Sequence, residues 1–167
     1  MERLADHWIE FGQLVIALGG VGFVIKQLFD VQESLDLQNK NLQAQTLATI
    51  YREYFRVCRE VVKRPHLRAF LYEGLRLDAA HKADDTLRAE VTTICELMTG
   101  VLEQAAVQRK NLPREAWLRC WRPFVREMYR NPASEFAEYY RKHRHFYATC
   151  FKAIVDPLLA NSEVESP

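Results

Sequence analysis

Residues 11–25 form the longest stretch without a charged side chain, and this stretch limits the possible folds more than any other feature of the sequence. Its apolar residues lie on every side of a helix, which requires lipid or a large protein core around it. Residues 8–29 give 22 positions, or about 33 Å of helix, enough for a hydrocarbon core of about 30 Å. Trp8 and Lys26 would then lie near opposite interfaces. We therefore expect one transmembrane helix over residues 8–29, with a buried core helix as the alternative.

Glycines support the membrane interpretation. Each glycine lowers helix propensity in water by about 1 kcal/mol, but glycines are ordinary in membrane helices. Gly12, Gly19 and Gly22 recur at spacings of seven and three, so they share a face that would let another helix approach closely in the membrane. The pattern is not a strict GxxxG motif and only suggests a helix–helix contact.

The charges near this segment predict its orientation. The first ten residues contain Glu2, Asp6 and Glu10 against Arg3 alone, unlike the basic start of a signal peptide. Basic residues follow the span, and they favour the cytoplasmic side. We expect residues 1–7 to form a short tail outside the cell inner membrane and the main domain to lie in the cytoplasm.

Residues 30–46 should continue the helix as a juxtamembrane stalk, because no proline occurs before Pro65. A seam of apolar and glutamine side chains steps by three and four through this stalk, a short heptad-like pattern typical of helix pairing. Its members are Leu28, Val31, Leu35, Gln38, Leu42 and Gln45. We expect a homo-oligomer that associates through the span and the stalk.

Residues 47–160 should form an all-α bundle of four to five helices, since no stretch shows the alternation of a β-strand. Pro65 should end the first long helix, and Asp84 or Asp85 should cap a later one. The later helix has the cleanest amphipathic period of the chain. Its apolar positions are Leu87, Val91, Ile94, Met98, Val101 and Ala105.

Three further prolines should shape the C-terminal part. Pro113 should open a Trp-rich helix, which Pro123 should kink or shorten. A last helix should run over residues 132–154, with a possible bend near His145, and Pro157 should close it. We expect residues 161–167 to be a disordered tail.

Residues 109–152 contain eleven Lys and Arg against four Glu, interleaved with aromatic residues. Four arginines recur at steps of three, four and four and would share one face that could contact phosphates, lipid headgroups before nucleic acid. They are Arg119, Arg122, Arg126 and Arg130. The favoured alternative is a solvated helix face, offset by the acidic segment of residues 73–103.

No catalytic residue, cofactor or metal site is expected. His143 and His145 are two apart, so on a helix they point about 200° apart and cannot share one ion. Glu73, Glu90 and Glu96 are expected to face solvent or to pair with Arg52, Arg56 or Arg88. The four cysteines lie among apolar neighbours, as reduced core thiols do. They are Cys58, Cys95, Cys120 and Cys150.

The order of features also resembles a known class of proteins. The quoted segments are SLDLQNKNLQAQT, RPHLRAFLYEG, WLRCWRPF and NPASEF. Together with the lone span they resemble bacterial single-pass membrane proteins with a cytoplasmic helical domain, of the DUF4760 and DUF6082 families of unknown function. Pro65, Leu67, Arg68, Tyr72 and Glu73 carry the sharpest part of the likeness. The resemblance implies the fold and the location and adds no catalytic residue.

The sequence therefore predicts a membrane-anchored, non-enzymatic interaction, scaffold or sensor module that contacts membrane lipid, a second copy and an unidentified protein partner. The alternative function is binding of anionic lipid or nucleic acid through the basic aromatic face. An enzyme with an unrecognised helical site is a third hypothesis.

Overall fold

In a computed structural model of the chain, the backbone is described for residues 2–72, 77, 78, 81 and 83–164, and the side chains for residues 20, 23–70, 77, 78, 81 and 83–160. The described residues contain helices and connecting segments but no strand, so the all-α class is confirmed. The chain divides into two units, residues 1–42 and residues 43–167.

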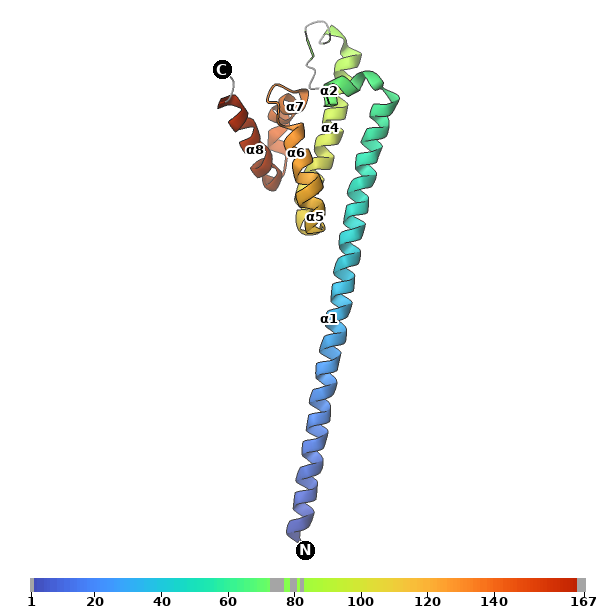
Figure 1. The fold of residues 1–167 in the computed structure, drawn as a ribbon, viewed down its shortest axis with the longest axis vertical. Coiled ribbons are helices and arrows are strands. Elements are labelled where there is room, and N and C mark those ends of the chain that lie inside the picture. Colours follow the sequence, from blue (N-terminus) through green and yellow to red (C-terminus); the bar gives the residue numbers. More distant parts are fainter. Residues whose placement is uncertain (1, 73–76, 79–80, 82, 165–167) are drawn as a thin grey trace. The chain divides into compact units, whose positions relative to one another are not determined.

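The first helix, α1 (Glu2–Lys63), is a single helix of 62 residues (Figure 1). It contains no proline, and Arg64, at φ −129° and ψ 74°, leaves the helical region directly before Pro65. A residue that precedes proline is pushed out of the α conformation by the proline ring, which explains where α1 ends. Unit 1 comprises most of this helix, and residues 43–63 of α1 belong to unit 2.

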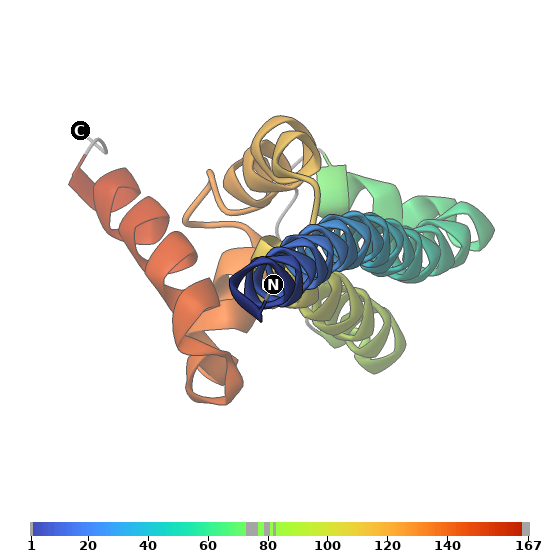
Figure 2. The ribbon, with the colours of Figure 1, turned by 90° about the horizontal axis from the view of Figure 1, so that it is seen from below.

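Unit 2 is a helical bundle. It contains η1 (Pro65–Leu67), α2 (Arg68–Tyr72), α4 (Asp85–Val107), η2 (Gln108–Lys110), α5 (Arg114–Ala116), η3 (Trp117–Trp121), α6 (Arg122–Met128), α7 (Glu135–His143), η4 (Arg144–Phe146) and α8 (Thr149–Val164). Within this unit, residues 43–63 of α1 and helix α8 lie on opposite flanks (Figure 2). Helix α4 packs against both α7 and α8.

The predicted period of α4 is confirmed. The side chain of Asp84 caps this helix by accepting hydrogen bonds from the backbone N–H groups of Thr86 and Leu87, both at 3.0 Å. Five of the six predicted apolar positions are buried, and Leu87 packs half-buried against the core. The buried five are Val91, Ile94, Met98, Val101 and Ala105.

Aromatic rings fill the space between α4, α7 and α8. Tyr129 has no exposed surface, and its ring makes edge-to-face contacts with Phe136, Tyr140 and Phe151 at centroid distances of 6.4, 5.6 and 6.1 Å. The hydroxyls of Tyr129 and Thr99 are 3.0 Å apart and satisfy each other inside the core. This polar contact therefore fixes how the loop after α6 packs onto α4.

The Trp-rich region is not one regular helix, in line with the predicted interruption at Pro123. Residues Trp117–Trp121 form a turn of π-helix between α5 and α6. Pro123 lies in the first turn of α6, where its missing N–H group costs little. The wider π-helical turn lets the chain accommodate Pro123 without leaving the helical conformation.

The predicted last helix over residues 132–154 is wrong in its boundaries, although the bend predicted near His145 is confirmed by the break between α7 and α8. Helix α7 begins only after Ser134, whose hydroxyl accepts from the Ala137 N–H at 3.3 Å, and the chain leaves the helical region at Tyr147. Pro157 does not close α8 but lies inside it, and the helix continues to Val164, into the segment predicted to be disordered. Burial of Phe151, Val155 and Leu159 on one face of α8 offsets the hydrogen bond that Pro157 cannot donate. Residues 165–167 lie outside the described backbone.

The hydrogen bond between Thr99 and Tyr129 leads to a prediction about the stability of the bundle. Tyr129→Phe leaves the Thr99 hydroxyl buried without its partner and should lower the free energy of unfolding by about 1–3 kcal/mol. Adding Thr99→Val removes both polar groups and should recover part of that loss. Urea unfolding measures both, with the exposed Thr93→Val as a control expected within about 0.5 kcal/mol of the wild type. Equal stability of Tyr129→Phe and the wild type would contradict the assignment.

Candidate functional site

Large apolar side chains remain exposed along the part of α1 that belongs to unit 1. Between residues 23 and 42 the exposed fractions run from 48% at Ile25 to 67% at Phe29. The set is Phe23, Val24, Ile25, Leu28, Phe29, Val31, Leu35, Leu37 and Leu42. Within the described part of the chain, these side chains form the longest run of exposed apolar surface, which contact with lipid or another protein would remove from water.

The predicted span over residues 8–29 lies in α1, but the side chains of residues 8–19, 21 and 22 lie outside the described ones. Among the residues that are described, no helix has both the length and the apolar character to cross a membrane. Gly12, Gly19 and Gly22 all have helical backbone, and their surroundings are likewise outside the description. The transmembrane helix, its orientation and its glycine contact therefore remain predictions.

The four predicted arginines do not form one uniform cationic face. Arg119 lies in the π-helical turn and pairs through Nε with the Glu115 carboxylate at 2.6 Å, while Arg130 lies beyond α6 and pairs with Glu127 at 3.9 Å. Arg122 and Arg126 lie on α6, exposed, and have no ion pair with any described residue. The structure therefore keeps two of the four as unneutralised cations on one helix.

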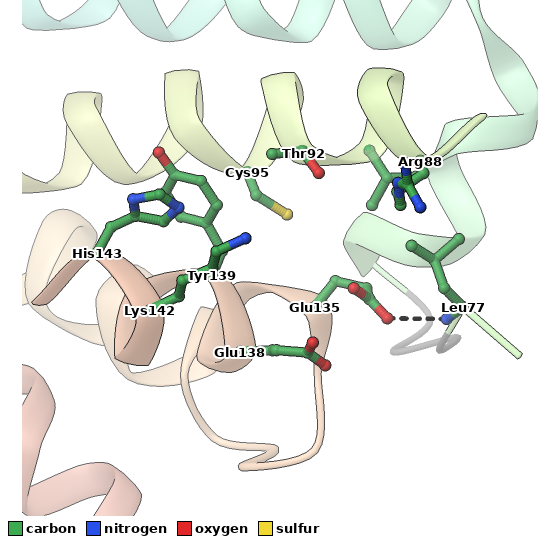
Figure 3. A pocket seen from close by; sticks show the side chains of 10 residues that line it. Leu77, Arg88, Thr92, Cys95, Glu135, Glu138, Tyr139, Lys142 and His143 are labelled. Carbon is green, nitrogen blue, oxygen red and sulfur yellow. Dashed lines mark hydrogen bonds between the residues drawn. The ribbon is translucent and has the colours of Figure 1, made fainter. Parts of the chain in front are cut away.

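A cavity of about 270 Å³ lies between α4, α7 and the segment of Leu77 (Figure 3). Its walls combine charged, polar and aromatic groups. The lining residues are Leu77, Arg88, Val91, Thr92, Cys95, Glu135, Glu138, Tyr139, Lys142 and His143. A mixed lining of this kind is the usual place to look for a ligand or a reaction.

Three ionisable groups of this cavity have environments that can be described in detail. The Glu135 carboxylate accepts a hydrogen bond from the backbone N–H of Leu77 at 2.8 Å (Figure 3). Burial, and next the charge of Glu135, raise the pKa of the Cys95 thiol, so it stays protonated and is a poor nucleophile. Burial also raises the pKa of Tyr139, against a hydrogen bond from Tyr147. Glu135 therefore holds the Leu77 segment in place, and Cys95 is a packed, protonated thiol.

His143 and His145, which the sequence analysis considered as metal ligands, both contact aromatic rings. His143 stacks on Tyr139 with a centroid distance of 4.4 Å, and His145 contacts Phe146 at 4.0 Å. No cluster of three or more His, Cys, Asp or Glu among the described residues is placed to hold a metal ion.

The cysteines differ from the expectation of four core thiols. All four are free, but only Cys95 is buried, whereas Cys58 and Cys150 are half-buried and Cys120 is exposed. Apolar neighbours in the sequence do not decide burial here, because Cys120 lies in the π-helical turn that shifts the helical phase.

Glu90 has different partners from those predicted. Its carboxylate forms an ion pair with Arg64 Nε at 3.3 Å and lies 2.9 Å from His66 Nε2. The pair joins the end of α1 and the turn after it to α4, so it fixes the first corner of the bundle. Glu96 is exposed, as expected, and Glu73 lies outside the described residues.

Two polar contacts that sequence patterns do not reveal position α8. The Glu103 carboxylate on α4 accepts from the Ala148 N–H at 2.6 Å, at the start of the helix. Arg144 clamps Asp156 through Nε at 3.0 Å and Nη2 at 2.6 Å, and the Tyr140 hydroxyl donates to the same carboxylate at 2.8 Å. The Arg144 guanidinium holds the pKa of Asp156 below its usual value.

No family model matches this chain, and no curated protein or solved structure shows significant similarity to it. The resemblance to the DUF4760 and DUF6082 families therefore remains a prediction.

The cysteine environments predict selective alkylation. In the folded chain a maleimide should label Cys120 first and leave Cys95 unlabelled, since burial both blocks access and keeps the thiol protonated. Mass spectrometry of peptides after timed labelling measures the order, and labelling in urea provides the control in which both react. Equal labelling of Cys95 and Cys120 in the native state would refute the described packing of α4.

Proposed function

We propose that the chain is a single-pass, membrane-anchored helical module without catalytic activity, whose bundle is presented for interaction with another protein. Residues 8–29 form the anchor in this proposal, and the bundle of unit 2 lies on the cytoplasmic side of the cell inner membrane. Acidic residues before the anchor and Lys26 and Lys40 after its apolar core support that orientation.

The exposed apolar residues at the end of the anchor carry the proposal. Phe23, Val24, Ile25, Leu28 and Phe29 are all about half or more exposed. At about 100° per residue these five positions spread over roughly two thirds of the helix circumference. One partner helix covers a stripe of about 100°, so a single protein contact would leave much of this surface in water. Lipid covers a helix from every side.

The polar groups inside the bundle support a non-enzymatic role. Several buried or half-buried acids, among them Glu90, Glu103 and Glu135, each hold two parts of the chain together. Active-site acids and bases must instead remain available to a substrate. Within the described residues, these acids stabilise the arrangement of the helices.

Fractionation of cells that express the full chain tests the anchor. We expect the protein in the membrane fraction, resistant to high salt and alkaline carbonate and released by detergent. The double variant Val15→Lys, Leu18→Lys should shift it toward the aqueous fraction, because each lysine near the centre of a span costs about 3 kcal/mol. The matched control Leu37→Lys, Asn41→Lys adds the same charge outside the span and should stay in the membrane. A wild-type chain that remains folded in the aqueous fraction would overturn the proposal.

Anionic headgroup binding is a second candidate, and the unneutralised pair Arg122 and Arg126 favours it. Each cation near an anionic surface contributes about 1 kcal/mol. Arg122→Gln, Arg126→Gln should therefore weaken binding of a water-soluble short-chain phosphatidylglycerol to the detergent-solubilised chain about thirtyfold.

The control for this test is Arg119→Gln, Arg130→Gln, which removes the same charge from arginines that already face Glu115 and Glu127. It should have a smaller effect. Equal losses in the two double variants, or equal binding of short-chain phosphatidylcholine, would exclude a headgroup site. Preference for a single-stranded oligonucleotide would replace it with nucleic-acid binding.

A further inference from the structure

A regular apolar seam follows one face of α1 beyond the proposed anchor. Its described members in unit 1 are Leu28, Val31, Leu35, Gln38 and Leu42. The four apolar side chains are exposed by 63%, 55%, 53% and 52%, so the chain itself does not cover them. Steps of three and four keep these positions on one side of the helix, as in the a and d positions of a coiled coil.

The charges of this segment lie away from the seam. Asp30, Glu33, Asp36 and Lys40 occupy the positions that face solvent when a and d are in contact. The rows that flank the seam are uncharged. They contain Gln27, Gln32, Ser34, Asn39 and Asn41. Two copies can therefore meet here without repulsion, and the surface offers no charge pattern that would select a differently charged partner.

The seam also has a defined end. The same spacing continued past Gln45 reaches Thr49, Arg52, Arg56 and Arg59, all exposed. In two parallel copies these arginines would face one another, and like charges at such positions repel. Of the apolar side chains of this region, Ile50, Val57 and Val61 lie in the core of unit 2, whereas Phe55 and Val62 are exposed.

We propose that the occupant of this seam is a second copy of the chain, paired in parallel and in register over residues 28–45. The parallel orientation rests on the proposed function, because two chains inserted from the same side leave the membrane in the same direction. Gln38 and Gln45 form polar layers that can hydrogen-bond across the pair, which lowers stability but fixes the register. Arg52 ends the contact, and the two bundles separate there.

Membrane tethering compensates for the short length of the seam. About two and a half heptads with two glutamine layers would pair weakly between free chains, since short helices gain little from isolated association. Confinement to one membrane makes the second contact effectively intramolecular and raises the local concentration toward the millimolar range. The pairing is therefore specific to the inserted chain.

Disulfide crosslinking of the full chain in its membrane tests this proposal. The background carries Cys58→Ser, Cys120→Ser and Cys150→Ser, so that the remaining native thiol is the buried Cys95. A single cysteine is then placed on the seam, as Val31→Cys, Leu35→Cys or Leu42→Cys. The matched controls Glu33→Cys and Lys40→Cys place it on the opposite face of the same helix. A mild oxidant and a non-reducing gel measure the dimer.

Only positions whose Cα atoms approach within about 7 Å can form a disulfide. We expect each seam variant to crosslink with itself at least fivefold more than either control. Crosslinking of Val31→Cys only when mixed with Leu42→Cys would show antiparallel pairing and overturn the proposal. Equal crosslinking on both faces, or none on the seam, would also overturn it.

The same gel separates this inference from the membrane anchor. Seam-specific dimers in the aqueous fraction would retain the contact between copies and reject the anchor. A chain that fractionates with the membrane but shows no seam preference would retain the anchor and reject the contact. Leu35→Asp combined with Leu42→Asp should abolish the dimer at a reference cysteine on Val31, without moving the chain between fractions.

Discussion

The exposure of apolar side chains on α1 is the constraint on which the interpretation of this protein depends. Burying a large aliphatic or aromatic side chain is favourable by about 1.5–3 kcal/mol. Scattered exposed residues are normal on any protein, but Phe23 to Leu42 includes nine large apolar side chains at about half exposure or more. In unit 2, Ile50, Val57 and Val61 of the same helix are buried, although Phe55 and Val62 are exposed. Most of the exposed large apolar side chains described on α1 therefore lie in unit 1.

In unit 2, polar contacts between residues far apart in the sequence hold the segments of the bundle together. Glu135 reaches the backbone of Leu77 across 58 positions of sequence, and Glu103 reaches Ala148 across 45. A buried carboxylate that accepts a backbone N–H compensates the cost of its own desolvation. Such groups hold distant segments of the bundle in place.

The sequence predicts those features of the fold that depend on neighbours along the chain. Helical period identifies the buried face of α4, and Asp84 and Pro65 mark boundaries through local stereochemistry. Patterns fail where a distant contact decides. The bend predicted near His145 does lie in the break between α7 and α8, but the contact from Glu103 to Ala148 and the continuation of α8 through Pro157 are not visible in the pattern. The face of four arginines stays a prediction, and the pattern does not reveal that a π-helical turn interrupts its helix or that Glu115 pairs with Arg119.

The proposed anchor and the proposed seam support each other. The proposed anchor accounts for apolar residues spread around the helix, which no single helix partner would cover. The proposed seam accounts for apolar residues confined to one face, which lipid would not select. The change from the first pattern to the second occurs near Leu28, where the first charged residue of the stalk, Asp30, follows. In the proposed arrangement the lipid environment ends there, because an ionised aspartate is costly in hydrocarbon, and protein covers the apolar face beyond it. A second copy, already confined to the same membrane, meets that requirement with no additional recognition element.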